Sequence, residues 1–161
     1  GALLAPENGT IDGQDDFDPS KTVVGYTPGT IWQTTVEGWA ADGKIKEARA
    51  TGDQTESIVA LQNGKIDAFL TDSPVVENLM KFQPETLKGL KLCSNYKDTE
   101  AEIGRIAPSV KFGNEDFMKD INKVVAEMRD EGVLDQIYEK YGLDPKLHAI
   151  TNDQKDNGLN K

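Results

Sequence analysis

The sequence predicts an α/β fold in which helices flank an open, mostly parallel sheet. Short apolar strands alternate with amphipathic helices over much of the chain, and this alternation usually produces parallel strands joined by right-handed crossovers. Two further amphipathic helices follow near the carboxyl end, after the alternation has stopped. The 161 residues suffice for one substantial core, or for one complete lobe together with part of a second.

Composition narrows the classes of partner. The formal net charge is −10, from 28 acidic and 18 basic residues, which argues against binding to nucleic acid or to an anionic membrane surface. No apolar run approaches the length of a membrane span, and no signal peptide is visible. Cys93 is the only cysteine, which excludes an internal disulfide and a cysteine-built metal site.

The first predicted elements are a strand at residues 1–5 and an acidic loop at residues 6–20. Pro6 ends the apolar run, and the residues after it are rich in Asp, Gly and Pro, which favour surface loops. Four aspartates give the loop some likeness to a calcium loop, but the regular ligand spacing and the closing glutamate are missing. They are Asp12, Asp15, Asp16 and Asp18. We therefore expect no metal there.

A second strand at residues 21–26 leads through a tight turn into a helix at residues 31–41. Thr30 is the predicted N-cap of that helix, since its hydroxyl can accept from first-turn N–H groups. One face of the helix is apolar, so we expect its tryptophans to belong to the core rather than to a ligand site. That face contains Trp32, Val36, Trp39 and Ala40.

A third strand is expected at residues 46–50, and Asp53 opens a helix that ends at Gly64. The next strand, residues 66–71, is too apolar to have a fully wet face, so we expect it to be buried on both sides. Asp72 follows where this strand stops.

The remaining elements complete the predicted order. They are a helix from Pro74 to about residue 82, strands at residues 89–93 and 103–107, helices at residues 116–129 and 134–141, and a polar, frayed tail at residues 151–161.

Two interpretations of Asp72 remain open. At the carboxyl end of a parallel strand, its carboxylate would lie in the crevice where open α/β sheets bind ligands. Alternatively, it only caps the helix that begins near Pro74, as aspartate does well.

The turn of Pro28, Gly29 and Thr30 also has two interpretations. It lies between a strand and a helix, so its free N–H groups favour an anion, although ordinary strand-to-helix turns look the same. Together, the N–H groups of the turn could bind a carboxylate and Asp72 could bind an ammonium. These are the two charged groups of an α-amino acid.

Groups for catalysis are scarce. His148 is the only histidine and lies near the polar tail, so no Ser-His-Asp or histidine-metal arrangement is expected. Neither a Walker-type phosphate loop nor a dinucleotide-binding glycine pattern is present. We therefore expect no enzyme activity, no cofactor and no metal.

Several stretches carry a resemblance to one family. Residues 21–30 are similar to the signature Gly-Lys-x-Val-Gly-Val…Gly-Thr-Thr, and residues 56–72 resemble Glu-Ala-x-x-Ala-Leu-x-Asn-Gly-Arg-x-Asp-Ala-x-x-x-Asp. Residues 103–107 look like a returning strand, and residues 122–142 resemble a closing pair of helices. Over about residues 1–143, the order of segments resembles the second half of a periplasmic amino-acid-binding protein, a family-three solute-binding protein of ABC transporters.

The resemblance implies a type II periplasmic-binding-protein-like lobe that holds an amino acid in a hinged cleft. The family's ammonium-binding aspartate falls on Asp72. Its carboxylate-binding Gly-Thr-Thr turn falls on Gly29, Thr30 and Ile31. Ile31 departs from the pattern, since it keeps the backbone N–H and loses the hydroxyl. Thr71 is a weaker candidate for lining the site.

The resemblance also divides the chain. It implies a crossover strand and acidic loop at residues 1–20, the ligand-binding second lobe at 21–107, helices of first-lobe type at 108–143 and a polar tail at 144–161. The N-terminal part of the first lobe, with the arginine that clamps the ligand carboxylate, has no counterpart. We therefore expect the apolar face of the helices to be covered by that missing lobe, by a second copy through segment exchange, or by the chain's own second lobe.

The implied function is capture of an amino acid for uptake by an ABC transporter. The implied partner is a membrane permease, and the location is periplasmic, or extracellular and membrane-tethered. One alternative is a sensor or interaction module with a vestigial cleft, which Ile31 and the missing arginine favour. Another is an enzyme similar to cyclohexadienyl dehydratases, for which a placed acid–base group is lacking.

Overall fold

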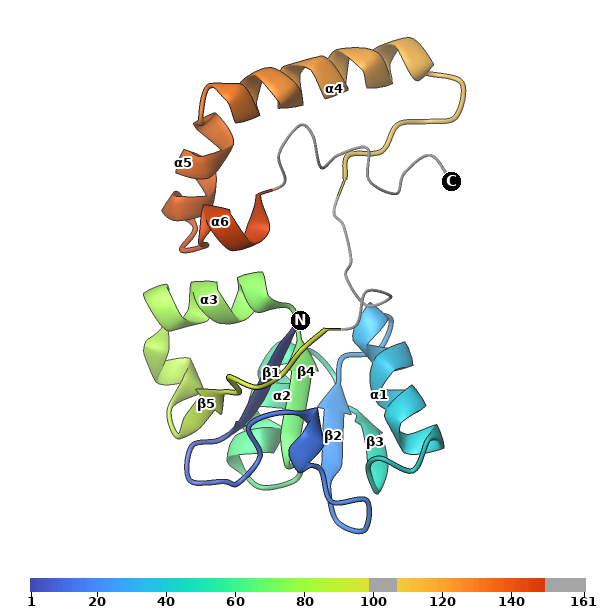
Figure 1. The fold of residues 1–161 in the computed structure, drawn as a ribbon, viewed down its shortest axis with the longest axis vertical. Helices are drawn as coiled ribbons and strands as arrows, with labels where there is room; N and C mark the ends of the chain where they lie inside the picture. The colour runs from blue at the N-terminus through green and yellow to red at the C-terminus, as the bar shows by residue number, and fades with distance from the viewer. Residues whose placement is uncertain (99–106, 150–161) are drawn as a thin grey trace. The chain divides into compact units, whose positions relative to one another are not determined.

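The chain forms two compact units (Figure 1). The computed structural model describes residues 1–98 and 107–149. The first unit, Gly1–Gly104, contains the sheet, and the second, Arg105–Lys161, contains three helices in its described part. None of the described helices is both long enough and apolar enough to cross a membrane.

The first unit is built on one five-stranded sheet with the strand order β3-β2-β4-β1-β5 (Figure 1). The strands are β1 (Ala2–Pro6), β2 (Val23–Tyr26), β3 (Glu47–Ala50), β4 (Ala68–Thr71) and β5 (Leu90–Leu92). β2 pairs in parallel with β3 and β4, whereas β1 is antiparallel to β4 and β5. The expected α/β fold with a mostly parallel open sheet is therefore confirmed, with β1 as its antiparallel strand.

β1 corresponds to the strand expected at residues 1–5. The predicted organisation names residues 1–20, a crossover strand and an acidic loop, separately from the lobe at 21–107. In the structure, β1 lies inside the sheet, with Ala2 opposite Thr71 and Leu4 opposite Leu92. Its four apolar residues are between 0 and 1% exposed, because both faces of the strand are covered.

Helices cover both faces of the sheet. They are α1 (Ile31–Ala41), α2 (Gln54–Gln62) and α3 (Ser73–Phe82), with the short 3-10 helices η1 (Gln14–Asp16) and η2 (Pro84–Leu87) in the connections. α1 packs on one face, and α2 and α3 pack on the other (Figure 1). Trp32 and Trp39 both belong to the apolar cluster beneath α1, as the helical pattern predicts.

β4 is the central strand and is buried on both faces, as predicted. Ala68 and Leu70 face the cluster beneath α1, whereas Phe69 faces the cluster beneath α2 and α3. Just before β4, the Asp67 carboxylate accepts from the Val23 N–H at 2.8 Å, and the Asp67 N–H donates to the Val23 carbonyl at 2.8 Å. These two bonds fix the register of β4 against β2 and so align their carboxyl ends.

α2 begins and ends where the sequence predicts. The Asp53 carboxylate accepts from the Glu56 N–H at 2.9 Å and so caps the first turn. Gly64 has a φ of +66°, a left-handed conformation that glycine adopts without steric cost after a helix end. The chain can therefore turn sharply from α2 back into β4.

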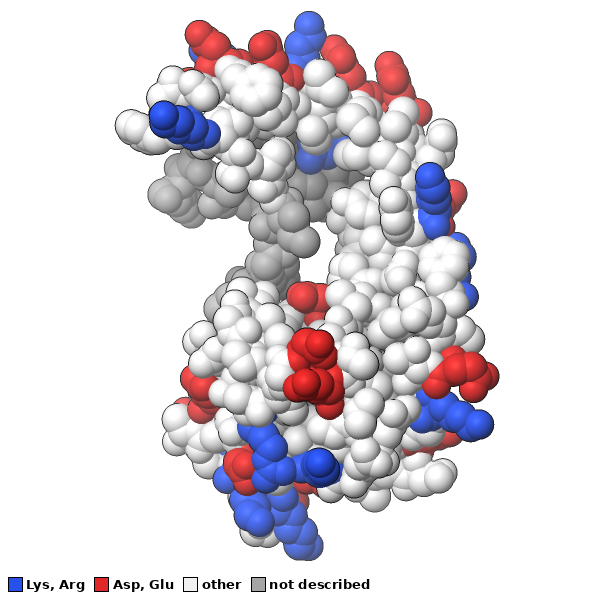
Figure 2. All heavy atoms as spheres, turned by 180° about the vertical axis from the view of Figure 1, so that it is seen from behind, with Lys and Arg blue, Asp and Glu red and all other residues white. Residues whose placement is uncertain are grey.

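The second unit contains α4 (Glu115–Asp130), α5 (Val133–Lys140) and α6 (Pro145–His148). None of the residues in these three helices is buried. Gly132, with a φ of +72°, turns the chain from α4 into α5. Figure 2 shows many of the charged side chains of this unit along one rim, next to a broad uncharged surface. Both predicted helices of this region are therefore present, and each has apolar side chains that are exposed among the described residues.

α6 was not expected, because the sequence analysis treats residues 144–161 as a polar tail. The Asp144 carboxylate accepts from the Lys146 N–H at 2.9 Å and caps this four-residue helix. The expected tail at 151–161 and all but the last residue of the expected strand at 103–107 lie outside the described residues.

Candidate functional site

The carboxyl ends of β2 and β4 lie side by side at one edge of the sheet. The two strands are parallel neighbours, with Val24 opposite Ala68 and Gly25 opposite Phe69. β2 leads through a turn into α1, and β4 leads through Asp72 into α3. The structure therefore brings both predicted halves of the site to the same edge, where open α/β sheets bind ligands.

Side chains of the turn and of the first turn of α1 form hydrogen bonds with some of the main-chain groups before α1. Gly29 has a φ of +79°, and its N–H donates to Gln33 Oε1 at 3.0 Å. The Thr30 hydroxyl donates to the Thr27 carbonyl at 2.7 Å. Thr30 therefore occupies the N-cap position but does not cap the helix through its side chain, which corrects that expectation.

The first turn of α1 keeps donors available for an anion. Within the described residues, the N–H groups of Ile31 and Trp32 donate no hydrogen bond. Ile31 is 48% exposed, and the positive end of the helix dipole lies at this turn. The main-chain N–H groups can therefore donate to a carboxylate here even though Ile31 has no hydroxyl.

Asp72 occupies the N-cap position of α3, yet its side chain makes no capping hydrogen bond. Pro74, the second residue of α3, has no N–H, which removes one of the donors that a capping carboxylate uses. Instead, the Trp32 Nε1–H donates to Asp72 Oδ1 at 2.9 Å. The structure therefore contradicts a capping role for this side chain.

Within the described residues, no donor reaches the second carboxylate oxygen of Asp72. Asp72 is exposed, and its Oδ2 accepts no hydrogen bond from the described part of the chain. Thr71, the preceding residue, is only 6% exposed, so little of its side chain reaches the surface beside Asp72. The carboxylate is therefore the more accessible of the two predicted groups at this strand end.

Trp32 is the residue of this site that the sequence analysis missed. It lies in the core beneath α1 as expected, but its indole N–H reaches the exposed carboxylate of Asp72. A buried indole N–H usually finds a partner. The sequence shows a tryptophan in the first turn of a helix and an aspartate at a strand end, but they are 40 positions apart, so only the fold reveals their contact.

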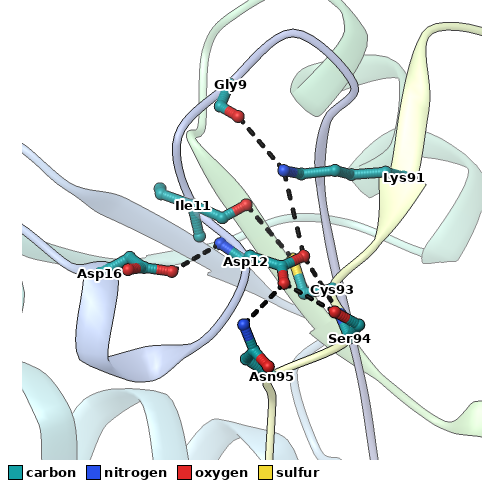
Figure 3. Close-up of polar contacts among 8 residues, drawn as sticks. All are labelled: Gly9, Ile11, Asp12, Asp16, Lys91, Cys93, Ser94 and Asn95. Carbon is teal, nitrogen blue, oxygen red and sulfur yellow. Dashed lines mark hydrogen bonds and ion pairs between the residues drawn. The ribbon is translucent and has the colours of Figure 1, made fainter.

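A second polar cluster ties the acidic loop to the segment after β5 (Figure 3). The Asp12 carboxylate accepts from the Ser94 hydroxyl at 2.7 Å, the Ser94 N–H at 3.1 Å and the Asn95 side-chain amide at 2.9 Å. The two bonds from Ser94, above all that from its hydroxyl, lower the pKa of Asp12. Lys91 Nζ lies 4.0 Å from Asp12 Oδ1 and donates to the Gly9 carbonyl at 3.2 Å.

A lysine ammonium therefore supplies the positive charge beside Asp12. In the described part of the chain, no group of three His, Cys, Asp or Glu side chains is placed to hold a metal ion.

Two grooves of the first unit do not include the candidate residues. One, of about 390 Å³, is open and runs along α2 between Thr51 and Lys65. The other, of about 210 Å³, is apolar and is lined by Leu4, Met80, Pro84, Leu87, Leu90 and Leu92. The candidate site is thus an exposed edge of this unit and lies in neither groove.

The mixed sheet, the helices on both of its faces and the two polar groups at one strand edge define a lobe of the type II periplasmic-binding-protein class. The model of the bacterial extracellular solute-binding proteins, family 3, matches residues 20–144. The chain therefore belongs to this family, and the resemblance found in the sequence is confirmed.

Curated relatives are similar over most of the chain. A probable histidine-binding protein of Campylobacter jejuni is 25% identical over 142 residues, which cover 88% of this chain and 51% of that protein. The L-cystine-binding protein TcyJ of Escherichia coli K12 is 28% identical over 142 residues, which cover 87% of this chain and 48% of TcyJ. The chain thus spans about half the length of the curated relatives it matches.

Solved structures show the same fold. An ancestral arginine-binding protein bound to arginine has a TM-score of 0.62 and 25% identity, over 87% of this chain and 58% of that chain. The substrate-binding protein AbpA of Streptococcus pneumoniae, bound to L-arginine, has a TM-score of 0.66 at 18% identity, over 87% of this chain and 55% of that chain.

Proposed function

We propose that this chain supplies one face of a hinged cleft that captures an amino acid for uptake by an ABC transporter. The observation that carries the proposal is the pairing, at one sheet edge, of an exposed carboxylate with open helix N–H groups. The N–H groups of Ile31 and Trp32 donate hydrogen bonds to the ligand carboxylate, and the Asp72 carboxylate accepts from the ligand ammonium. Gly29 and Thr30 shape the turn, and Thr71 lies behind Asp72.

The relatives support this class of ligand. Their names refer to histidine, cystine and arginine, which share the α-ammonium and α-carboxylate and differ in the side chain. The proposed mechanism is capture without bond making, in which closure of two lobes around the ligand presents a form that a membrane permease can recognise. The family is extracellular, and we infer a periplasmic or membrane-tethered location and no catalytic activity.

The second unit supports an incomplete cleft. Apolar side chains of its described residues are exposed, including Phe117, Val124, Ile137 and Leu147. An uncovered surface of this kind usually marks an interface. We propose that first-lobe polypeptide covers it, since the matched relatives are about twice as long, with a second copy by segment exchange as the alternative.

Light scattering and amide hydrogen exchange on this chain can identify which polypeptide covers the apolar surface of the second unit. A dimer with protected α4 and α5 amides supports segment exchange, whereas weak protection of both helices supports the missing lobe. A monomer with strongly protected α4 and α5 amides would contradict both forms of the proposal.

The binding proposal is tested by nuclear magnetic resonance on this 17.6 kDa chain. Each of the twenty amino acids is added at about 10 mM, which detects the weak binding expected of one cleft face. We expect one or a few of them to shift the backbone amide signals of Ile31 and Trp32. Asp72→Asn should weaken that binding about ten- to a hundredfold, because it removes a charge-assisted hydrogen bond.

Asp42→Asn is the matched control, since Asp42 is also exposed but lies at the carboxyl end of α1. It should leave the titration unchanged. The proposal fails if no amino acid shifts the amides of Ile31 and Trp32, or if the two substitutions have the same effect.

A further inference from the structure

Trp32 contacts the candidate ammonium-binding carboxylate through the one polar atom of its side chain. It lies in the first turn of α1, whereas Asp72 follows β4, and the Nε1–H to Oδ1 distance is 2.9 Å. The bond therefore joins the element that offers N–H groups to the element that offers the carboxylate.

The indole ring is held in place by its surroundings. Trp32 is 3% exposed and belongs to the apolar cluster beneath α1. The backbone of Gly1 also lies against the ring, since a Cβ built on Gly1 would be 2.6 Å from Trp32 Cη2 and 2.9 Å from Cζ3. A ring packed on its faces and edge gives its N–H a fixed direction.

A helix-capping conformation of Asp72 is an alternative to the one observed. In a capping conformation, its carboxylate would accept from the N–H of the third residue of α3, Val75, because Pro74 at the second position has none. In the structure, the Val75 N–H points instead to the main-chain carbonyl of Asp72, at 3.2 Å. The bond from Trp32 therefore favours the observed orientation of this exposed side chain over the capping orientation.

We propose that Trp32 is a positioning residue for Asp72. Its indole N–H holds Oδ1, turns the carboxylate away from α3 and leaves Oδ2 directed to the ligand edge. This inference rests on the proposed function and adds a source of selectivity to it: the site favours α-amino acids over the same carboxylic acids without the α-ammonium.

Paired ligands test the proposal. The probes are L-histidine with imidazolepropionate and L-arginine with 5-guanidinopentanoate, so each pair differs only in the α-ammonium. Trp32→Phe keeps an aromatic ring and removes the N–H; we expect it to weaken the amino acids about tenfold and to change the acids less than about twofold. Trp39→Phe on the same helix is the control, and it should not change the ratio within a pair.

A purely structural role for Trp32 would weaken both members of a pair equally, and that result would overturn the proposal. Because Trp32→Phe can disturb the core, Asp72→Asn provides a second measurement in the ligand-free protein. It should move the indole N–H signal of Trp32 and leave that of Trp39 in place, and an unmoved Trp32 signal would also overturn the proposal. If wild type binds none of the twenty amino acids, the proposed function fails, whereas the indole signals still decide whether Trp32 holds Asp72.

Discussion

Replacing Gly25 with alanine and Ile66 with valine should each destabilise the first unit, but combining the two should restore part of the loss. Gly25 lies in β2, and a Cβ built on it would be 2.5 Å from Ile66 Cδ1. The next atoms, Ile66 Cγ2 and Thr51 Cγ2, are both at an ordinary 3.6 Å. The clash therefore involves one methyl group, and valine lacks that methyl.

The magnitudes follow from this geometry. Ile66 is 1% exposed, so its Cδ1 can move only against other core atoms, and the overpacking in Gly25→Ala should cost about 1–3 kcal/mol. Part of this loss is offset, because alanine restricts the unfolded chain more than glycine does, which stabilises the folded state by about 0.4–1 kcal/mol. Ile66→Val should cost about 0.5–1.5 kcal/mol. In the double variant the new Cβ fills the space of the lost methyl, which predicts a favourable coupling energy of about 1–2 kcal/mol.

Urea unfolding followed by tryptophan fluorescence can measure this cycle. The chain has two tryptophans, and both lie in α1, so the signal reports the unfolding of the first unit. In a thermal scan, each kcal/mol should move the midpoint by about 4–8 °C for a unit of this size. Gly38→Ala serves as the control, since no atom lies within 4 Å of a Cβ built there; its effect should add to that of Ile66→Val.

Additivity of Gly25→Ala and Ile66→Val within about 0.5 kcal/mol would refute the reasoning. It would mean that the strands shift apart to admit the new methyl group, independently of the Ile66 side chain.

Two further predictions concern the Asp12 cluster and the cysteine near it. Because hydrogen bonds from Ser94 lower the pKa of Asp12 below its ordinary value of 3.8, its contribution to stability is present above that value and is lost as the pH falls through the lower folded pKa. Between pH 5 and pH 3, approximately, the unfolding midpoint of wild type should fall more steeply than that of Asp12→Asn; parallel curves would contradict this. Burial raises the pKa of the Cys93 thiol to about 11, so alkylation by iodoacetamide at pH 8 should be at least about a hundredfold slower in the folded protein than in denaturant. Similar rates in both states would show that the thiol is accessible.

Local patterns predicted the individual elements well. The apolar spacing of α1 predicted both of its ends, and the aspartate before α2 and the glycine after it marked that helix. These signals operate over a few residues, so a single sequence contains them. α6 was missed because a four-residue helix started by Asp144 offers too short a pattern to separate from a polar tail.

Long-range contacts explain what the sequence could not settle. The choice between capping and ligand binding for Asp72 depends on Trp32, which lies 40 positions earlier in the chain. The place of β1 depends on pairing with β4 and β5. No local pattern specifies either contact, although the residue types involved were all visible: a buried donor, an exposed carboxylate and a fully apolar strand.

The antiparallel position of β1 also has a consequence for biosynthesis. A ribosome releases β1 well before Thr71 and Leu92, the residues with which Ala2 and Leu4 pair. At about 5–20 residues per second, the residues that pair with this apolar strand are synthesised about 3–18 s after it. During that interval it has no partner within the sheet, and contacts of such high sequence separation form slowly. Until β4 and β5 are synthesised, β1 is therefore an exposed apolar segment of the first unit that can aggregate. A charge introduced at Leu3 or Leu4 would reduce this aggregation, but it would also destabilise the core of the folded unit.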